Sequence, residues 1–242
     1  MSRLAFISDI HSNRQALTAV MESIAYLDCQ EILCLGDLVG YGAKPSECVD
    51  LLRGAGARCL LGNHEAMVTG KEPGLGFNEK SLLAAEITRG LLPAEALEFL
   101  AGLPLTINLK PDVLLCHGSP TNYSQYIHLE GDFSLLCQDM ETAGLNLCFL
   151  GHTHKPAWFD GQDLWQGGPK EFLLSAGRRH IINPGSVGQP RDRDPRASFA
   201  VWDQEAGTIG FHRVEYDIQA AQADIIQAGL PEQLADRLLE GR

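Results

Sequence analysis

Short apolar runs alternate with amphipathic stretches in the first half of the chain. Runs at residues 4–8, 31–35 and 58–61 have the length and apolar composition of buried strands. Between the first two runs, apolar residues recur at helical spacing up to Leu27, after a Ser-Asn-Arg-Gln segment at 12–15 that has the form of a capping box. This alternation predicts βαβ units and a largely parallel sheet.

Helical patterns continue to about residue 100 and then give way to apolar runs separated by turn residues. A helix is predicted from Pro45 to just before Gly54, and two more over residues 80–89 and 93–100. Six later runs have the pattern of strands: residues 106–109, 113–116, 147–150, 181–183, 198–202 and 210–214. Glycine and proline cluster between them, which indicates hairpins. The whole pattern predicts two sheets packed together with helices outside.

The segment from Asp217 onward has the pattern of two short helices broken at residues 229–231. Ile218, Ala221 and Ile225 fall on one face of the first helix. We expect this helical tail, residues 217–242, to cover a sheet edge or face, and a homodimer contact is the alternative.

Composition and charge limit the class of protein. The 242 residues are 45% hydrophobic and 21% charged, which suits a single domain over residues 1–242. The net charge of −12 argues against a basic nucleic-acid-binding face, so an anionic substrate must be attracted by local positive charge. Neither an apolar run of about 20 residues nor a signal-peptide pattern is present, which predicts a cytoplasmic protein without membrane contact. The seven cysteines contain no Cys-x-x-Cys spacing and are expected to be core residues.

Histidines and carboxylates cluster just after the predicted strands, where open α/β sheets build their sites. The set comprises Asp9, His11, Asp37, Asn63, His64, His117, His152 and His154. Taken singly, an Asp-x-His segment is more often a helix cap, and Gly-Asp is a common turn. Because the pieces occur together, the set predicts a metal site.

The residue types also fit two metal ions. Asp9 and His11 offer an oxygen and a nitrogen from one turn, while Asp37 has two carboxylate oxygens and can bridge two ions. Mixed imidazole and carboxylate ligation suits Mn, Fe, Co, Ni or Zn better than Ca or Mg. Two divalent ions, two carboxylates and a bridging hydroxide leave a net charge of about +1, which favours a phosphate group. The chemistry predicted is hydrolysis of a phosphoester by metal-activated water.

The motifs Asp9-x-His11, Gly36-Asp37, Gly62-Asn63-His64-Glu65, His117 and Gly151-His152-x-His154 resemble, in order and spacing, those of the calcineurin-like metallophosphoesterase superfamily. The likeness covers residues 3 to about 203. It implies a four-layer αββα sandwich, with two mixed sheets flanked by helices and a di-metal site at one edge.

The resemblance also implies roles for the motif residues. Asp9, His11 and His154 would hold the first ion, Asn63, His117 and His152 the second, and Asp37 would bridge them. His64 matches the family's non-ligand histidine, which protonates the leaving oxygen or stabilises developing charge. Glu65 is expected to orient its loop. Mn²⁺ is the expected metal, with Fe, Co, Ni or Zn as alternatives.

One departure from the family pattern reduces the number of substrate classes expected. Protein Ser/Thr phosphatases of this superfamily carry Gly-Asp-x-Val-Asp-Arg, whereas here Gly40 and Tyr41 stand where they have aspartate and arginine. The run looks more like that of small bacterial phosphodiesterases and dinucleoside tetraphosphatases. We therefore expect a phosphodiesterase or nucleotide phosphohydrolase. The alternatives are a phosphomonoesterase, including a protein phosphatase, and a non-catalytic binding module on the same fold.

Several residues outside the ligand set are candidates for substrate contact. Tyr41, Tyr123 and Tyr126 could stack on a base or phenyl group, and Arg191 or Arg193 could reach a phosphate. Asn13 could contact phosphate or simply cap the first helix. For each of these side chains, ordinary packing or a solvated loop position is the alternative.

Overall fold

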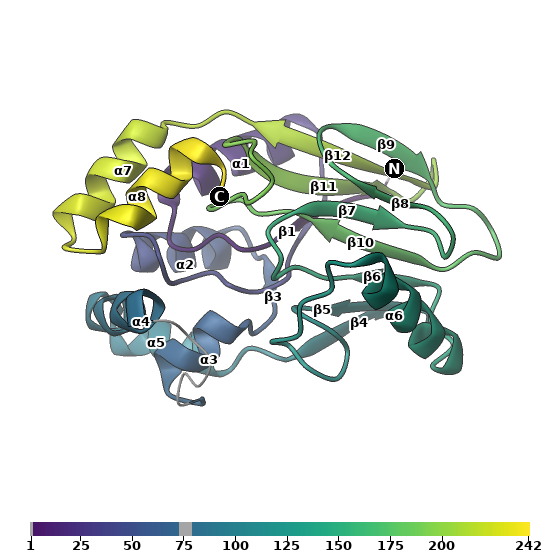
Figure 1. Cartoon of the computed structure of the whole chain (residues 1–242), viewed down its shortest axis with the longest axis horizontal. Helices are drawn as coiled ribbons and strands as arrows, with labels where there is room; N and C mark the ends of the chain where they lie inside the picture. The colour runs from purple at the N-terminus through teal and green to yellow at the C-terminus, as the bar shows by residue number, and fades with distance from the viewer. Residues whose placement is uncertain (1, 73–78) are drawn as a thin grey trace.

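Two six-stranded sheets form the centre of the molecule in the computed structural model, which describes residues 2–72 and 79–242 (Figure 1). The first sheet has the strand order β3-β2-β1-β11-β12-β9, and the second has β4-β5-β6-β10-β7-β8. Both sheets are mixed, with parallel and antiparallel neighbours. The N-terminal parallel sheet that the sequence predicts is therefore one half of a larger mixed sheet.

The first sheet combines the chain's N-terminal strands with strands from its last third. Its parallel half consists of β1 (Arg3–Ile7), β2 (Glu31–Cys34) and β3 (Arg58–Cys59). The antiparallel half consists of β11 (Ala197–Asp203), β12 (Thr208–Val214) and β9 (Lys170–Leu173).

The second sheet is built from the middle of the chain. Its strands are β4 (Thr106–Lys110), β5 (Val113–Cys116), β6 (Leu147–Phe149), β10 (His180–Pro184), β7 (Pro156–Phe159) and β8 (Leu164–Gln166). Strands β5, β6 and β10 run parallel to one another, so their carboxyl ends lie at one edge.

Helices cover the outer faces and complete the four layers. Those of the first half are α1 (Arg14–Tyr26), α2 (Pro45–Gly54), α3 (Asn63–Thr69), α4 (Glu79–Leu91) and α5 (Ala94–Ala101). Buried residues of α1, α2, α3 and α5 pack on the first sheet, and α6 (Glu130–Thr142) packs on the second. The predicted αββα sandwich is confirmed.

Alternation along the strands explains how the layers are held together. In β1, Ala5 and Ile7 face the helices, whereas Leu4 and Phe6 face the other sheet. The ring of Phe6 stacks on that of Phe149 in β6, with centroids 3.6 Å apart and planes 2° from parallel. This pair lies in the apolar core between the two sheets.

The structure differs from the sequence prediction at several elements. The helix α3 and the strands β7, β8 and β9 were not predicted because they are short, and α6 was not predicted because few of its 13 residues are apolar. The start of α1 also lies one residue later than the capping-box pattern indicates. Its cap is Asn13, whose Oδ1 accepts a hydrogen bond from the Ala16 N–H at 3.1 Å.

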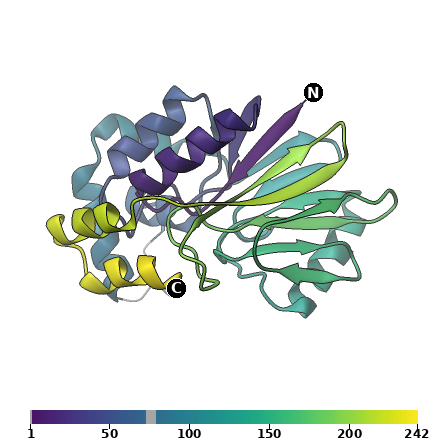
Figure 2. The same cartoon turned by 90° about the horizontal axis from the view of Figure 1, so that it is seen from above.

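The C-terminal tail forms the two helices expected, α7 (Ile218–Gln227) and α8 (Glu232–Glu240), but the predicted sheet cover is wrong. In the described part of the chain these helices pack on other helices. Ala221 and Leu234 share an apolar cluster with Ala84 of α4. Figure 2 shows the two yellow helices beside the purple and blue helices of the N-terminal half. Over residues 2–72 and 79–242, no helix is long and apolar enough to cross a bilayer.

Replacing Phe149 by alanine should lower the free energy of unfolding by about 3–5 kcal/mol, because a buried aromatic ring is lost and a cavity remains. Urea unfolding followed by circular dichroism measures the change. Tyr26→Ala is the control, since this side chain is 90% exposed, and it should change stability by less than about 0.5 kcal/mol. Equal stability of the two variants would contradict the assignment of this core.

Candidate metal centre

The candidate ligands lie on loops that leave the carboxyl ends of five strands drawn from both sheets. The loop after β1 carries Asp9 and His11, the loop after β2 carries Asp37, and α3 begins at Asn63 just beyond β3. From the second sheet, β5 is followed by His117 and β6 by His152 and His154. Because the sheets pack face to face, these loops meet at one edge of the sandwich.

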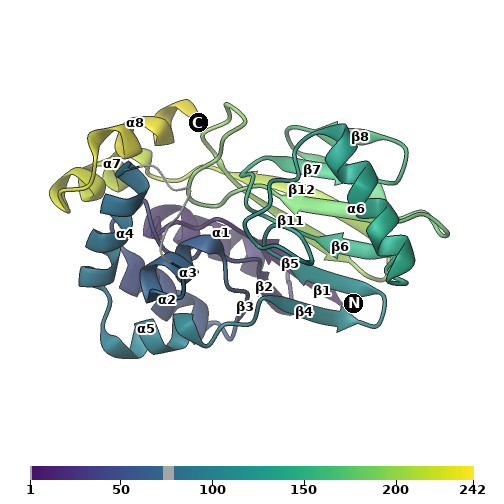
Figure 3. The ribbon, with the colours of Figure 1, turned by 60° about the horizontal axis from the view of Figure 1, so that its bottom comes forward.

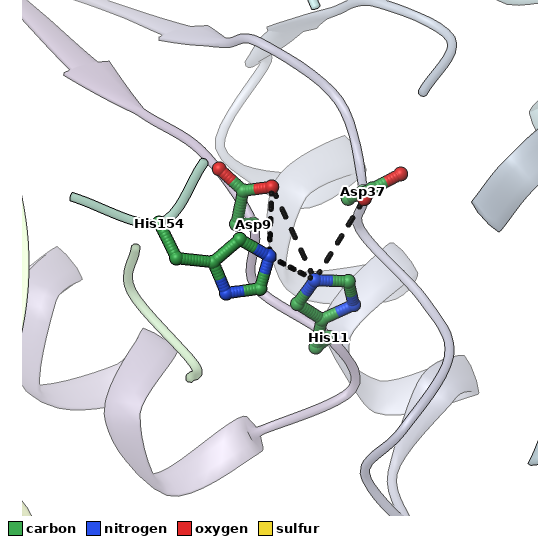
Figure 4. Close-up of side chains that lie close together, drawn as sticks. All are labelled: Asp9, His11, Asp37 and His154. Carbon is green, nitrogen blue, oxygen red and sulfur yellow. Dashed lines mark hydrogen bonds and ion pairs between the residues drawn. The ribbon is translucent and has the colours of Figure 1, made fainter. Parts of the chain in front are cut away.

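One group of side chains is formed by Asp9, His11, Asp37 and His154 (Figure 4). The His154 Nε2 lies 3.4 Å from Asp9 Oδ1 and 3.1 Å from the Nε2 of His11. The His11 Nε2 lies 4.0 Å from Asp9 Oδ1 and 3.7 Å from Asp37 Oδ2. All four side chains are buried and point toward a common centre.

A second group adjoins the first and consists of Asp37, His117 and His152. The His117 Nε2 lies 3.2 Å from Asp37 Oδ2 and 3.1 Å from Asn63 Oδ1. The same carboxylate oxygen of Asp37 therefore faces both groups. The other oxygen, Oδ1, accepts a hydrogen bond from the His64 backbone N–H at 2.9 Å.

Backbone carbonyls fix the orientation of all four imidazoles. The contacts are His11 Nδ1 to Val39 O (3.2 Å), His117 Nδ1 to Leu35 O (2.7 Å), His154 Nδ1 to Gln189 O (2.6 Å) and His152 Nε2 to Ser124 O (3.1 Å). A carbonyl only accepts, so each of these nitrogens carries the proton. When such a ring is neutral, its other nitrogen presents a lone pair, which is the arrangement that metal-ligating histidines share.

Converging lone pairs show that the site fits a cation. With Nδ1 of His11 and His154 protonated, their Nε2 atoms face each other at 3.1 Å as two acceptors. Asp9 Oδ1 is buried beside them and accepts no hydrogen bond from any described residue. Oxygen and imidazole donors together suit a transition-metal ion at this place.

The pKa shifts follow from the same geometry. Burial lowers the pKa of His11 and His154 well below the usual value, and it lowers that of His152 to about 3. Burial would raise the pKa of Asp37, but the charges of His117 and His64 outweigh it and hold the pKa well below its usual value. The Asp37 carboxylate likewise overcomes the effect of burial on His117, raising its pKa to about 9. The position shared by Asp37 and His117 therefore attracts positive charge.

Backbone strain is concentrated in the same loops. Nine described residues other than glycine have a positive φ, and five of them are candidate ligands: Asp9, His11, Asp37, His152 and His154. This conformation costs on the order of 1–3 kcal/mol for each residue and is maintained only where the surroundings enforce it. The fold therefore holds the ligands in place at the expense of stability.

Glu65 provides part of that enforcement. Its Oε2 accepts from the backbone N–H groups of Asp37 and Gly62, both at 2.8 Å, and its Oε1 accepts from Val39 at 3.1 Å. One buried carboxylate thus ties the loop after β2 to the loop after β3. This contact geometry is what an orienting role for Glu65 requires.

Three of the candidate substrate residues lie beside the ligands. The Tyr41 ring is 4.6 Å from the His11 ring, and the Tyr126 ring is 4.0 Å from the His152 ring. The Arg191 guanidinium lies 5.8 Å from the centre of the Tyr41 ring.

The other three candidates have structural contacts. Asn13 caps α1 and donates to Gly188 O at 2.9 Å, Tyr123 packs against the apolar core that the first sheet shares with its helices, and the Arg193 N–H donates to Gly241 O at the end of α8. Sequence reasoning missed Arg237 of α8, which lines a cleft beside Tyr41. The sequence contains no motif around Arg237 that could have identified it.

The match to a family model agrees with this geometry. The model of the calcineurin-like phosphoesterase superfamily domain matches residues 2–207, so the chain belongs to that superfamily. It is a metal-dependent phosphoester hydrolase, and its clustered Asp and His residues indicate a dinuclear metal site.

Individual relatives match over their full lengths. An uncharacterised protein of Methanocaldococcus jannaschii is 40% identical over 246 residues, covering 100% of this chain and 99% of the relative. The crystal structure of a metallophosphoesterase from Sphaerobacter thermophilus is 37% identical, with a TM-score of 0.87 and 100% and 99% coverage of the two chains. A hypothetical protein of Pyrococcus horikoshii shares the fold at 22% identity, with a TM-score of 0.83 and the same coverage.

Changing Asp37 to asparagine should lower the metal content from two ions per chain to one or none, because the shared oxygen loses its charge. Mass spectrometry of the metals after Mn²⁺ loading and desalting measures the change. Asp28→Asn is a matched control, since Asp28 also has a positive φ (56°) but lies in an exposed turn. Equal metal content in the two variants would contradict a bridging Asp37.

Proposed function

We propose that this protein is a phosphodiesterase or nucleotide phosphohydrolase that acts on small esters with two divalent ions, Mn²⁺ being the expected metal. The observation that carries the proposal is the single Asp37 oxygen facing two groups of inward-pointing donors. We assign Asp9, His11 and His154 to one ion and Asn63, His117 and His152 to the other, with Asp37 shared. The whole chain is proposed to act as one domain in the cytoplasm.

The charges of the donor set support an anionic substrate. Divalent ions bound here would polarise the phosphoryl oxygens and supply a nucleophile at neutral pH. Only Asp9 and Asp37 bring negative charge to the ligand set, because the other ligands are histidines and an asparagine. With two divalent ions bound, the centre would therefore keep positive charge, which would hold the phosphoryl group and orient it for in-line attack.

His64 is proposed to donate a hydrogen bond to the leaving oxygen as its negative charge develops. Its ring lies 4.7 Å from the His11 ring and 4.4 Å from the Tyr41 ring. Gly40 makes this position possible, because a Cβ at residue 40 would collide with the His64 Nδ1. The glycine at residue 40 thus allows the His64 ring to lie against the loop after β2.

The aromatic walls support a diester rather than a monoester. Tyr41 lies beside His11 in one group, and Tyr126 lies beside His152 in the other. A diester has two organic substituents, and each could stack on one of these rings. A phosphomonoesterase would need only one such surface, and protein contacts alone would not need buried, inward-facing donors.

His64→Asn should reduce kcat by about 10²–10⁴-fold while leaving two metal ions bound, because asparagine removes the proton donor but no ligand. Steady-state assays with a nitrophenyl diester measure kcat, and metal analysis of the same sample measures the number of bound ions. The control is His128→Asn, whose side chain is 51% exposed and lies outside the ligand set. Loss of the metals from the His64 variant would reject this role.

A substrate panel tests the diesterase preference after Mn²⁺ loading. It contains a nitrophenyl monoester, a bis-nitrophenyl diester, 2′,3′-cyclic nucleotides and diadenosine tetraphosphate. We expect kcat/KM to be highest for the diesters, because two aromatic faces flank the centre. Turnover of the monoester alone would refute the preference.

A further inference from the structure

The C-terminal helices form one wall of the region beside the metal centre. They lie beyond residues 2–207, the part matched by the superfamily model. Leu234 and Leu238 of α8 belong to the apolar cluster that contains Ala84 of α4, and Tyr41 packs against the same cluster. Figure 3 shows α4 below α7 and α8. The loop that carries Tyr41 thus lies against both α4 and α8.

Polar contacts fix the tail in this position. Asp224 of α7 accepts a hydrogen bond from Gln15 Nε2 at 2.8 Å and lies 3.5 Å from Lys44 Nζ. At the far end, Gly241 O accepts from the Arg193 N–H at 2.8 Å. The tail is therefore held at both ends by segments that adjoin the ligand loops.

This arrangement places Arg237 of α8 near the site. The side chain is partly buried, and its Nε donates to Arg242 O at 2.7 Å, which leaves the terminal nitrogens for other partners. Burial lowers the pKa of Arg237, the charge of Arg191 lowers it further, and Tyr41 and Tyr126 act in the opposite sense. Arg237 lines a cleft with Tyr41, and the Arg191 guanidinium lies 5.8 Å from the centre of the Tyr41 ring, so both arginines lie beside Tyr41.

A cleft of about 640 Å³ opens between α4 and α8 beside Tyr41. Its described walls include Tyr41, Lys80, Ser81, Leu234 and Arg237, and also Glu79. The Tyr41 hydroxyl lies 3.3 Å from Ser81 Oγ, so the tyrosine separates this cleft from His11 and His64. A substrate held at the metal centre could extend past Tyr41 into the cleft.

Two guanidinium groups beside the same tyrosine repel each other, and an anion bound between them would offset this repulsion. The protein as a whole carries a net charge of −12, so this local excess of positive charge opposes the overall composition. The scissile phosphoryl group is already accounted for by the metal centre. The two arginines therefore favour binding of a second anionic group of the substrate, and an Arg guanidinium pairs well with phosphate.

We propose that Arg191 and Arg237 form a subsite for a second phosphate group, so that the preferred substrates are organic di- or polyphosphates, such as nucleotides with a phosphate chain. This inference rests on the proposed function, because it assigns the second phosphate a place relative to the hydrolysed one. Arg191 is held by Gln189 Oε1 at 2.9 Å, and Arg237 by the carbonyl of Arg242. Both guanidiniums are thus oriented before substrate binds.

The kinetic test compares Arg237→Gln with the unchanged enzyme on two Mn²⁺-dependent substrates. For diadenosine tetraphosphate, kcat/KM should fall about 10–100-fold, mainly through KM, because a charge-assisted contact to phosphate is lost. For bis-nitrophenyl phosphate, which has one phosphate, the change should stay below about twofold. Arg237→Lys should restore part of the loss on the polyphosphate. Arg53→Gln, which removes an exposed arginine paired with Glu95, is the control for charge.

A binding measurement separates this subsite from the proposed activity. Calorimetry with Mn²⁺ in equal excess should give tighter binding of α,β-methylene-ADP than of AMP, by about tenfold, and Arg237→Gln should bring the ratio within about twofold. Equal losses of kcat/KM on both substrates, no loss on either, or an unchanged binding ratio would overturn the subsite. If the unchanged enzyme hydrolyses neither substrate, the proposed function fails. The binding ratio still shows whether the subsite exists.

Discussion

The carboxylate of Asp37 joins loops that come from both sheets. One of its oxygens faces His11 from the first sheet and His117 from the second, and the other accepts from the His64 backbone. Since Asp37 is fully buried and has a positive φ, it would not keep this place without support. Glu65 supplies that support through three backbone hydrogen bonds, and the packed sheets keep the two sets of loops at a fixed separation.

Much of the fold could be predicted from local pattern. Strand β5 begins and ends where its apolar run does, and the parallel pairing of β1 with β2 follows from the helix between them. The candidate ligands were also visible, because each follows a strand and all are of types that bind metals. The ligands converge because the two sheets pack face to face. This packing cannot be predicted from the spacing of the residues in the sequence.

Other features depend on contacts between distant segments and had no local signal. Strand β9 has mostly exposed side chains, and it is a strand because β12 offers it a partner. The tail was expected on a sheet, yet its apolar residues share a buried cluster with α4. Burial of small residues such as Ala84 of α4 and Ala235 of α8 favours this packing. Arg237 acquires its position only through this packing, so its neighbours could not be inferred from residues around it in the sequence.

Charge explains why such a tail would be useful to this chain. Two divalent ions bound by two carboxylates, with a hydroxide, would give the centre a charge of about +1, enough for one phosphodiester but little more. A substrate with further phosphates is more negative, and the acidic surface of the protein would repel it. Arg191 and Arg237 would raise the local charge to about +3 without adding a ligand to the metals. The superfamily domain can thus keep its ligand set while the segment beyond it changes which phosphate esters are attracted.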